Sequence, residues 1–256
     1  MSLLELKNVS MRFGGVVAVD NLSMEVKKGE LVSLIGPNGA GKTTVFNVLT
    51  GVYPKAEGEI KFDGEQILGK DIQSIVKLGI SRTFQNLRVF GRQRVIENVM
   101  MGNTRNVSYG LFDIFFRTKK FREEERKSAQ HALDVLSMLG IENLKDAYAA
   151  SLPYGSQRKL EIARAIAADA KLILLDEPAA GMNASETAEL MEFVRSLVDK
   201  GYTILMIEHD MNMVMNISDR IYVLNFGKLI ATGTPREISS DQNVIDAYLG
   251  GGDEYE

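Results

Sequence analysis

The sequence predicts an α/β protein with a mainly parallel core sheet, an antiparallel β subdomain and an inserted α-helical subdomain. Three observations predict this class. The first 30 residues alternate apolar and polar side chains, as in an antiparallel sheet with one solvated face. Strand-like and helix-like segments alternate in the flanking parts of the chain, which favours parallel strands joined by helices. Between them, from about residue 94 to residue 151, strand-like patterns stop.

Two hairpins are expected in the antiparallel part. The stretches LLELKNVSMRF and LSMEVKKGE flank the turn signal Gly14-Gly15, and GEIKFDGEQI carries the turn signal Asp63-Gly64. The run LVSLIG is typical of a short strand buried on both faces, and a helix is expected from about Thr43 to Leu49. A strand, a glycine-containing loop and a helix therefore follow the first hairpin.

The later segments complete the alternation. KSAQHALDVLSMLG predicts an amphipathic helix that Gly140 ends. KLILLDE and YTILMIEHD predict buried strands with the amphipathic helix ETAELMEFVRSLVDKG between them, and RIYVLNFGKLIATG predicts a closing hairpin. The inward faces of the two helices are expected to carry Ala129, Ala132, Leu133, Leu136 and Leu139, and Leu190, Phe193, Val194 and Leu197.

The composition is that of an ordinary soluble globular protein, with 256 residues, 45% of them hydrophobic and 25% charged. The formal net charge of −4 gives the whole protein no attraction to nucleic acid. The absence of cysteine excludes disulfides and thiolate metal sites, and His131 and His209 alone leave little room for a histidine metal site. No apolar run of about 18 residues and no secretory leader is present, so we expect a cytoplasmic protein that docks on any membrane partner.

The stretch GPNGAGKTT fits the phosphate-binding pattern G-x-x-x-x-G-K-[ST] between a predicted strand and a predicted helix. Glycines let backbone N–H groups point at phosphate oxygens, and a helix N-terminus adds positive potential. Lys42 would meet the outer phosphates and Thr43 would bind Mg²⁺. A chance match is possible in any glycine-containing loop, but the flanking elements argue against it, so we expect a bound nucleotide with Mg²⁺. The expected nucleotide-binding residues are Gly36, Asn38, Gly39, Ala40, Gly41, Lys42, Thr43 and Thr44.

Four further polar residues lie at the ends of predicted strands. Asp176 and Glu177 follow the buried run of KLILLDEP, where open α/β sheets bind ligands. Asp176 would hold Mg²⁺, and Glu177 would either accept a proton from the attacking water or hold that water in line. Gln85 follows GISRTF and could reach Mg²⁺ or that water, whereas His209 follows YTILMI and could bind a γ-phosphate. Each of the four alone would be an ordinary residue at a strand end.

These motifs occur in the order found in an ABC-transporter ATPase, and the chain resembles that family over essentially its whole length. The resemblance rests on the phosphate loop, Gln85, SLPYGSQRKLEIARA, LILLDEP, AAGMN and IEHD. TFQNLRVF, DEPAAGMN, IEHDMNMVM and AYLG resemble the longer ATPase subunit of high-affinity branched-chain amino acid importers.

The resemblance implies a single nucleotide-binding domain over 1–256. Residues 1–93 would hold the β subdomain and the phosphate-loop part of the core, 94–156 the helical subdomain, and 157–256 the rest of the core. It also implies a head-to-tail dimer, in which each ATP lies between one subunit's phosphate loop and the other's signature motif. Phe13 falls at the adenine-stacking position, although hairpin packing would also suit it, and Asn183 replaces the family's usual acidic residue in the loop that crosses the dimer interface.

The signature motif departs from the family pattern Leu-Ser-Gly-Gly-Gln. Here the residues after Leu152 are Pro153, Tyr154, Gly155 and Ser156, all expected to face the partner's nucleotide. Proline lacks both the hydroxyl of the family's serine and a backbone N–H. As a helix start Pro153 is ordinary, because proline is favoured in the first turn. We expect a weakened phosphate contact that still works through Gly155, Ser156 and the helix dipole.

The expected partners are membrane-spanning permease subunits, a second ATPase subunit of the same or a related sequence and, indirectly, a substrate-binding protein. A groove lined by Leu87, Val89 and Phe90, with Arg88 at its rim, would receive the permease. Residues 109–120, YGLFDIFFRTKK, would either lie near lipid headgroups and membrane subunits or pack on the helical subdomain. Import of urea or other amides, export of lipopolysaccharide, a non-transport ABC ATPase and a non-hydrolysing nucleotide sensor remain alternatives.

Overall fold

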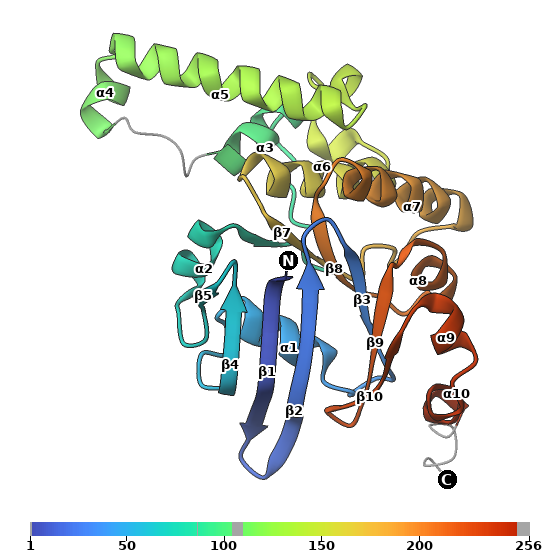
Figure 1. Ribbon diagram of the computed structural model, residues 1–256. Helices are drawn as coiled ribbons and strands as arrows, with labels where there is room; N and C mark the ends of the chain where they lie inside the picture. The colour runs from blue at the N-terminus through green and yellow to red at the C-terminus, as the bar shows by residue number, and fades with distance from the viewer. Residues whose placement is uncertain (1, 86, 104–109, 250–256) are drawn as a thin grey trace. The chain divides into compact units, whose positions relative to one another are not determined.

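The computed structural model describes residues 2–85, 87–103 and 110–249, which form two compact units (Figure 1). The first unit takes the described residues of 2–82, 171–181 and 194–249, and the second takes those of 83–170 and 182–193. The three-part division at residues 93 and 156 stays a prediction.

The first unit contains a four-stranded antiparallel sheet of order β2-β1-β4-β5. Both predicted turns are confirmed, with Gly14-Gly15 between β1 and β2 and Asp63-Gly64 between β4 and β5. Asp63 and Gly64 have φ angles of 49° and 84°, the left-handed pair that a two-residue hairpin turn favours. The strands are β1 (Ser2–Phe13), β2 (Val16–Lys27), β4 (Glu57–Phe62) and β5 (Glu65–Gln66).

The same unit contains a six-stranded sheet of order β10-β9-β3-β8-β7-β6, in which only the β9–β10 pair is antiparallel. The mainly parallel sheet and its closing hairpin are therefore confirmed. Every residue of β3, β7 and β8 is buried, as expected of central strands covered on both faces. The strands are β3 (Leu31–Ile35), β6 (Ile80–Arg82), β7 (Leu172–Asp176), β8 (Thr203–Ile207), β9 (Arg220–Asn225) and β10 (Lys228–Gly233).

Helix α1 follows β3 directly and buries Val45, Phe46, Val48 and Leu49 in a core shared with both sheets. Aspartate side chains cap the N-termini of two later helices. Asp71 accepts the N–H of Ser74 at α2, and Asp210 accepts two first-turn N–H groups at α8. The helices of the first unit are α1 (Lys42–Leu49), α2 (Ile72–Leu78), α8 (Met211–Ile217), α9 (Pro235–Ser239) and α10 (Gln242–Leu249).

The described residues of the second unit form helices and no strand, as the sequence predicts for the inserted part. Helices α3, α5 and α6 pack on one another, and a Cβ on Gly102 of α3 would lie 2.4 Å from the Arg164 carbonyl oxygen of α6. The elements are α3 (Val95–Gly102), α4 (Leu111–Phe115), α5 (Lys119–Met138), η2 (Glu142–Leu144), η3 (Ala149–Ser151), α6 (Tyr154–Ala167) and the first part of α7 (Ala184–Asp199).

The inward faces predicted for α5 and α7 are largely confirmed. In α5, Ala132, Leu136 and Leu139 are buried, whereas Ala129 and Leu133 are half-buried. Gly140 ends that helix with a φ of 70°. The four residues predicted for α7, namely Leu190, Phe193, Val194 and Leu197, are all buried.

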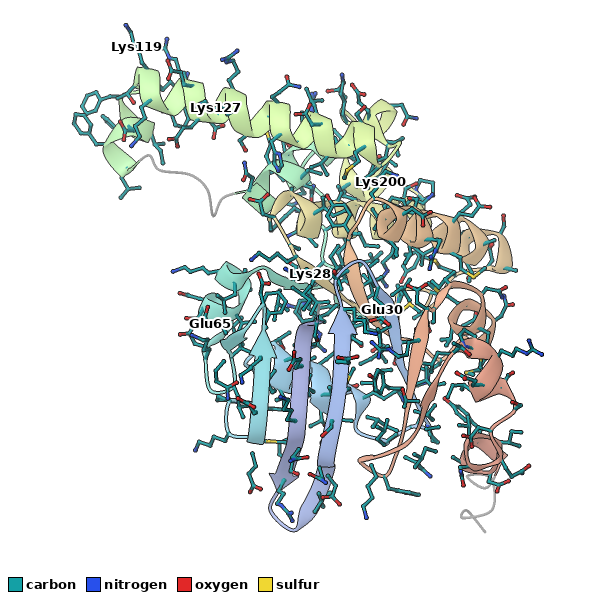
Figure 2. All side chains as sticks on the ribbon, in the orientation of Figure 1. Lys28, Glu30, Glu65, Lys119, Lys127 and Lys200 are labelled. Atoms are coloured by element: carbon teal, nitrogen blue, oxygen red, sulfur yellow. The ribbon has the colours of Figure 1, made fainter. Side chains whose placement is uncertain are left out.

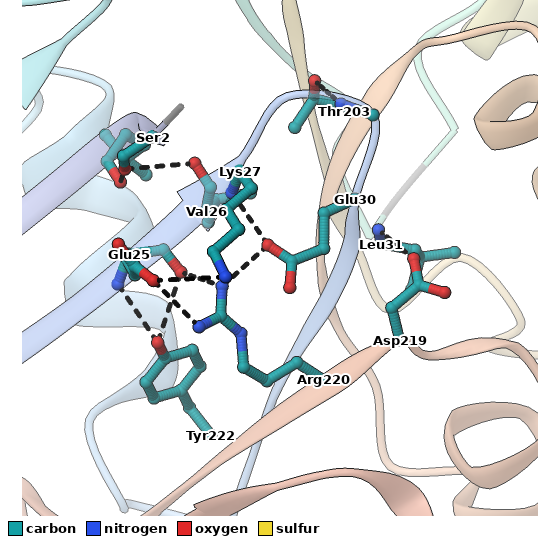
Figure 3. A network of polar contacts seen from close by, with 12 residues as sticks. Ser2, Glu25, Val26, Lys27, Glu30, Leu31, Thr203, Asp219, Arg220 and Tyr222 are labelled. Atoms are coloured by element: carbon teal, nitrogen blue, oxygen red, sulfur yellow. Dashed lines mark hydrogen bonds and ion pairs between the residues drawn. The ribbon is translucent and has the colours of Figure 1, made fainter.

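Ion pairs and hydrogen bonds connect the two sheets of the first unit and the segments that join their strands. Lys28 and Glu30 lie at the β2–β3 connection (Figure 2), where Lys28 pairs with Asp63 of the β4–β5 turn at 2.9 Å. Figure 3 shows the larger network, in which the Arg220 guanidinium of β9 donates to the carboxylates of Glu25 at 3.1 Å and Glu30 at 2.7 Å. One guanidinium therefore joins β2, the β2–β3 connection and β9.

The Arg220 network predicts a stability effect without a direct effect on the site. Arg220→Met removes the guanidinium and leaves the Glu25 and Glu30 carboxylates facing each other, so the free energy of unfolding should fall by on the order of 1–3 kcal/mol. Lys228→Met is the control, because Lys228 makes only an exposed pair with Asp20 at 3.6 Å and should cost less than about 1 kcal/mol. Urea unfolding of the two variants measures the difference, and equal midpoints would contradict this role.

Candidate functional site

Three predicted site segments follow neighbouring strands of the parallel sheet. Gly36 follows β3, Asp176 ends β7, and His209 comes two residues after β8, the strand that lies between the other two. The carboxyl ends of parallel strands meet at one edge, which is where open α/β sheets bind ligands. The first unit therefore brings the phosphate loop (residues 36–44), Asp176, Glu177 and His209 to one edge.

Glycine is required at both ends of the phosphate loop by the backbone around it. A Cβ on Gly36 would lie 2.1 Å from the carbonyl oxygen of Leu224, and one on Gly41 would lie 2.3 Å from that of Ala18. Their φ angles of 150° and 102° also disfavour other residues. Asn38 and Gly39, at the middle of the loop, are exposed. The two ends of the loop therefore pack closely against the backbone of β9 and β2, whereas its centre is exposed to solvent.

The N-terminus of α1 is suited to an anion. Its N-cap is Gly41, so no side chain accepts the N–H groups of the first turn. Those groups have no intrahelical acceptor and carry the positive end of the helix dipole. Thr43 is exposed and Thr44 is half-buried at this end, and both offer hydroxyls. A phosphate group fits this arrangement of donors.

Lys42 is held inside the loop, with only 5% of its surface exposed. Its ammonium donates to the carbonyl oxygens of Gly36 at 2.6 Å and Pro37 at 2.9 Å. Burial lowers the pKa of Lys42, while the negative charge of Glu177 opposes that shift. An anionic ligand in the loop would add to the effect of Glu177 and favour the charged lysine.

Asp176 is buried and forms an ion pair that the sequence analysis missed. Its carboxylate accepts from the Arg82 guanidinium at 2.6 Å, and Arg82 also donates to the side chain of Asn47 on α1 at 2.7 Å. Arg82 is the last residue of β6. An arginine within the strand-like GISRTF was the sequence feature that could have predicted this pair. A metal ion at Asp176 would share this carboxylate with the guanidinium.

Glu177 and His209 meet directly. The His209 Nε2 atom lies 2.8 Å from the Glu177 Oε1 atom. Glu177 has a φ of 47°, unusual for a non-glycine residue, and its N–H donates to the Ile207 carbonyl of β8 at 2.9 Å. Strained backbone of this kind gathers at functional sites and persists where the surroundings fix it. The arrangement places a carboxylate and an imidazole together at the sheet edge.

Glu208 is a second residue that sequence reasoning missed. Its side chain is only 3% exposed, and it accepts the N–H groups of Ala179 at 2.8 Å, His209 at 2.7 Å and Asp210 at 3.3 Å. Its carboxylate thus ties the segment after Glu177 to the segment that carries His209. The signal was a carboxylate directly before His209 in IEHD.

Phe13 lies at the end of β1 with 42% of its surface exposed. Its ring packs edge to face on Tyr53 with 5.0 Å between centroids. An aromatic face this exposed in the first unit has area left for a planar ligand.

The signature residues start α6 in the second unit. Pro153 is the N-cap, one residue before the first turn in which the sequence placed it, and its carbonyl accepts the N–H of Gln157 at 3.0 Å. Tyr154, Gly155 and Ser156 are half-buried in the first turn, where N–H groups have no intrahelical acceptor. Pro153 itself is exposed and makes no capping hydrogen bond.

Gln85 also belongs to the second unit, because β6 ends at Arg82, before GISRTF is complete. The buried Arg158 of α6 donates to the carbonyl oxygens of Phe84 at 2.8 Å and Gln85 at 3.0 Å, and it pairs with Glu161 at 2.8 Å. Burial raises the pKa of Glu161, and the charge of Arg158 opposes the shift. Sequence reasoning missed this pair. It could have been predicted from the i,i+3 spacing of an arginine and a glutamate in the first half of a predicted helix.

Asn183 acts as a helix cap. Its side-chain oxygen accepts the N–H groups of Ser185 and Glu186 at 3.0 Å each, at the start of α7. Asparagine serves here as well as an acidic residue would.

The donor set suits a hydrated metal bound with phosphates. No group of three or more histidine, cysteine, aspartate or glutamate residues suited to a metal ion occurs in the described part of the chain. Mg²⁺ is usually held by one or two protein oxygens, substrate phosphates and water, which the Thr43 hydroxyl and the Asp176 carboxylate fit. Within the described ranges, no helix has the length and apolar character needed to cross a membrane.

Comparison with known proteins gives the following matches. Residues 19–180 match the ABC transporter family model, and residues 228–254 match that of the branched-chain amino acid ATP-binding cassette transporter. LivG of Salmonella typhimurium, a high-affinity branched-chain amino acid transport ATP-binding protein, is 46% identical over 97% of this chain and 98% of its own length. BraF of Pseudomonas aeruginosa, described in the same terms, is 43% identical over the same shares. The ADP conformation of MJ1267, an ATP-binding cassette of an ABC transporter, aligns with a TM-score of 0.84 and 34% identity over 98% of this chain and 99% of the other.

Glu208→Gln tests the tie between the two loops. The amide presents a donor where the carboxylate accepts N–H groups, so the free energy of unfolding should fall by about 1–3 kcal/mol and ATP hydrolysis should slow. The control is Glu189→Gln, because the exposed Glu189 carboxylate pairs with the half-buried Lys159 at 3.4 Å. Loss of this surface pair should cost less than about 1 kcal/mol. Denaturant unfolding and steady-state ATPase assays measure both effects, and a Glu208→Gln variant with normal stability and turnover would contradict the prediction.

Proposed function

The chain belongs to the ABC transporter family, and we propose that it is the ATP-hydrolysing subunit of a branched-chain amino acid importer. The match of residues 228–254 and the high identity to LivG and BraF support this cargo. The single observation that supports hydrolysis best is the 2.8 Å contact between Glu177 and His209 beside the phosphate loop.

The nucleotide would be held by the first unit. Phe13 stacks on the adenine, the N–H groups of Asn38 to Thr44 hold the phosphates, and Lys42 exchanges its contacts with Gly36 and Pro37 for the outer phosphates. Thr43 and Asp176 would hold Mg²⁺, which would neutralise phosphate charge. The proposal requires Asp176 to keep or share its ion pair with Arg82.

Glu177 is the general base in this proposal. Its carboxylate takes the proton of the attacking water. His209 holds Glu177 before nucleotide binding and turns to the γ-phosphate afterwards. The strained backbone of Glu177 and the three N–H bonds of Glu208 support a fixed backbone at both residues, from which the His209 side chain can turn.

A second ATPase subunit would complete each site. We expect a head-to-tail dimer in which Tyr154, Gly155 and Ser156 of α6 face the partner's γ-phosphate. The start of α6 supports this, because its first-turn N–H groups lie at the positive end of a 14-residue helix. Pro153 contributes neither an N–H nor a hydroxyl.

Permease subunits would dock on the second unit, and a substrate-binding protein would act through them. The segment after β6 offers Phe84 and Phe90, which are 37% and 48% exposed, with Arg88 stacked on Phe84 and Arg164 on Phe90. Leu87 and Val89 are half-buried beside them. Docking there would hold the chain at the cytoplasmic face of the cell membrane.

Glu177→Gln tests the proposed chemistry and cargo together. The amide keeps the shape of the side chain but cannot accept the proton, so hydrolysis should slow by about 10²- to 10⁴-fold while Mg-ATP binding persists. Cells that carry only this variant should lose leucine uptake. Near-normal ATP turnover would remove Glu177 from the base role. Loss of urea uptake with leucine uptake intact would assign a different cargo.

Pro153→Ser tests the signature contact. In the Glu177→Gln background the new hydroxyl and N–H should strengthen ATP-dependent dimerisation by roughly 10- to 100-fold, the value of one charge-assisted hydrogen bond. Monomer affinity for ATP should be unchanged, because the signature faces the partner's nucleotide. Pro153→Ala is the matched control, since it restores the N–H without the hydroxyl. Dimer fraction against ATP concentration measures the effect, and identical curves for all three would show that Pro153 only starts the helix.

A further inference from the structure

Helix α4 and the residue after it expose much of their apolar side-chain surface. Within the second unit, the exposed fractions are 86% for Leu111, 70% for Phe112, 45% for Ile114, 81% for Phe115 and 60% for Phe116. We call these five residues the apolar tip. Packing of this segment on the helical subdomain, one of the two sequence hypotheses, is therefore wrong for these side chains. Tyr109 of the same stretch lies outside the described residues.

The apolar tip is one patch, because its aromatic rings contact one another. The Phe112 and Phe116 centroids lie 4.5 Å apart, and those of Phe115 and Phe116 lie 5.1 Å apart. Single exposed apolar residues are normal on a protein surface, whereas three exposed rings in contact, with Leu111 and Ile114 exposed on the same helix, indicate an interaction site.

A basic group directly follows the apolar tip. Arg117, Lys119, Lys120 and Arg122 are all exposed, and Figure 2 shows Lys119 extending away from the start of α5. Asp113 is the one acidic residue in the described stretch 111–122. Residues 111–122 therefore carry four basic side chains and one acidic one, and Glu123, Glu124 and Glu125 follow directly in α5.

Local hydrogen bonds hold the tip and the basic group together. Asp113 accepts the Gly110 N–H at 3.1 Å and the Thr118 hydroxyl at 2.8 Å, and Thr118 in turn caps α5 by accepting the Phe121 N–H at 3.3 Å. The hydrogen bond from Gly110 lowers the pKa of Asp113, so the ionised carboxylate is favoured and accepts hydrogen bonds within this turn. Apolar and cationic side chains are thus presented from one ordered turn.

We propose that the apolar tip and the basic group form a docking surface for an anionic lipid bilayer. Exposed phenylalanine and leucine next to lysine and arginine is the combination that inserts shallowly at the headgroup boundary and is attracted by anionic lipid. Such a bilayer supplies both an apolar layer and negative charge. The contact goes beyond the proposed function, because it requires neither nucleotide nor permease.

A second copy of the chain fits the surface less well. A two-fold contact through the apolar tip would bring two basic groups together, and like charges at close range oppose association. The permease is the remaining occupant, and the experiment separates it from lipid.

The experiment measures binding of the isolated, nucleotide-free chain to lipid vesicles by flotation. Vesicles of phosphatidylcholine with roughly 30% phosphatidylglycerol should bind the chain, and vesicles of pure phosphatidylcholine should bind it at least about tenfold more weakly. Replacing both lysines in Lys119→Gln/Lys120→Gln should weaken binding by about 25-fold, at roughly fivefold for each basic residue near the surface. Phe112→Ser/Phe115→Ser should weaken binding to both vesicle types by at least about tenfold.

Controls separate a specific surface from a general effect of charge. Lys127→Gln/Lys200→Gln removes two exposed lysines elsewhere and should leave binding within about threefold of the unmodified chain, as should Glu177→Gln. Equal loss in this control and in Lys119→Gln/Lys120→Gln would overturn the proposal.

Two further results would also overturn it. The first is vesicle binding that appears only when permease subunits are present, which would assign the surface to a protein partner. The second is self-association that Phe112→Ser/Phe115→Ser abolishes in a chain that binds no vesicles, which would assign it to a second copy. Because no arm measures hydrolysis, failure here is distinct from failure of the proposed ATPase function.

Discussion

The close approach of the phosphate loop to two sheets is the constraint on which the site depends. Gly36 contacts the backbone of β9 and Gly41 that of β2, at distances that leave no room for a Cβ. Backbone hydrogen bonds also link the loop to both sheets through Gly227, which lies between β9 and β10. The Gly227 N–H donates to the Ala40 carbonyl at 3.0 Å, and the Asp20 N–H of β2 donates to the Gly227 carbonyl at 2.8 Å. The antiparallel sheet therefore sets the shape of the loop from one side and the parallel sheet sets it from the other.

Charged side chains at this edge have partners within the fold, either loop carbonyl oxygens or other side chains. Lys42 is bonded to loop carbonyls, Asp176 to Arg82, and Glu177 to His209. Lys42 and Asp176 are buried, and a buried charge without a partner would cost several kcal/mol, so their contacts stabilise the site. Ligand binding must then exchange partners rather than simply add contacts. The affinity for a ligand then depends on the difference in free energy between the contacts made with the ligand and the contacts within the protein that it replaces.

The sequence predicted what depends on local pattern. The buried runs before Gly36 and Asp176, the turns at Gly14 and Asp63, and the order of strands and helices follow from periodicity and turn chemistry. Arg82, Arg158 and Glu208 were missed because each acts through a partner distant in sequence or through backbone groups that only the fold brings near. The strand containing GISRTF was expected to run to Phe84, but it ends at Arg82, since pairing with β7 stops at Leu174. Pairing partners of that kind leave no local signal.

Within the second unit, one buried pair fixes the loop of Gln85 to α6. Arg158 and Glu161 are 0% and 6% exposed, and the guanidinium uses the carbonyl oxygens of Phe84 and Gln85 as well as the carboxylate. Moving that loop away from α6 would leave a guanidinium buried with fewer acceptors, which is costly in a low-dielectric interior. The first turn of the same helix carries Tyr154, Gly155 and Ser156. A change in the position of Gln85 is therefore opposed unless α6 moves with it, so the fold couples the two segments of this unit that are proposed to face nucleotide.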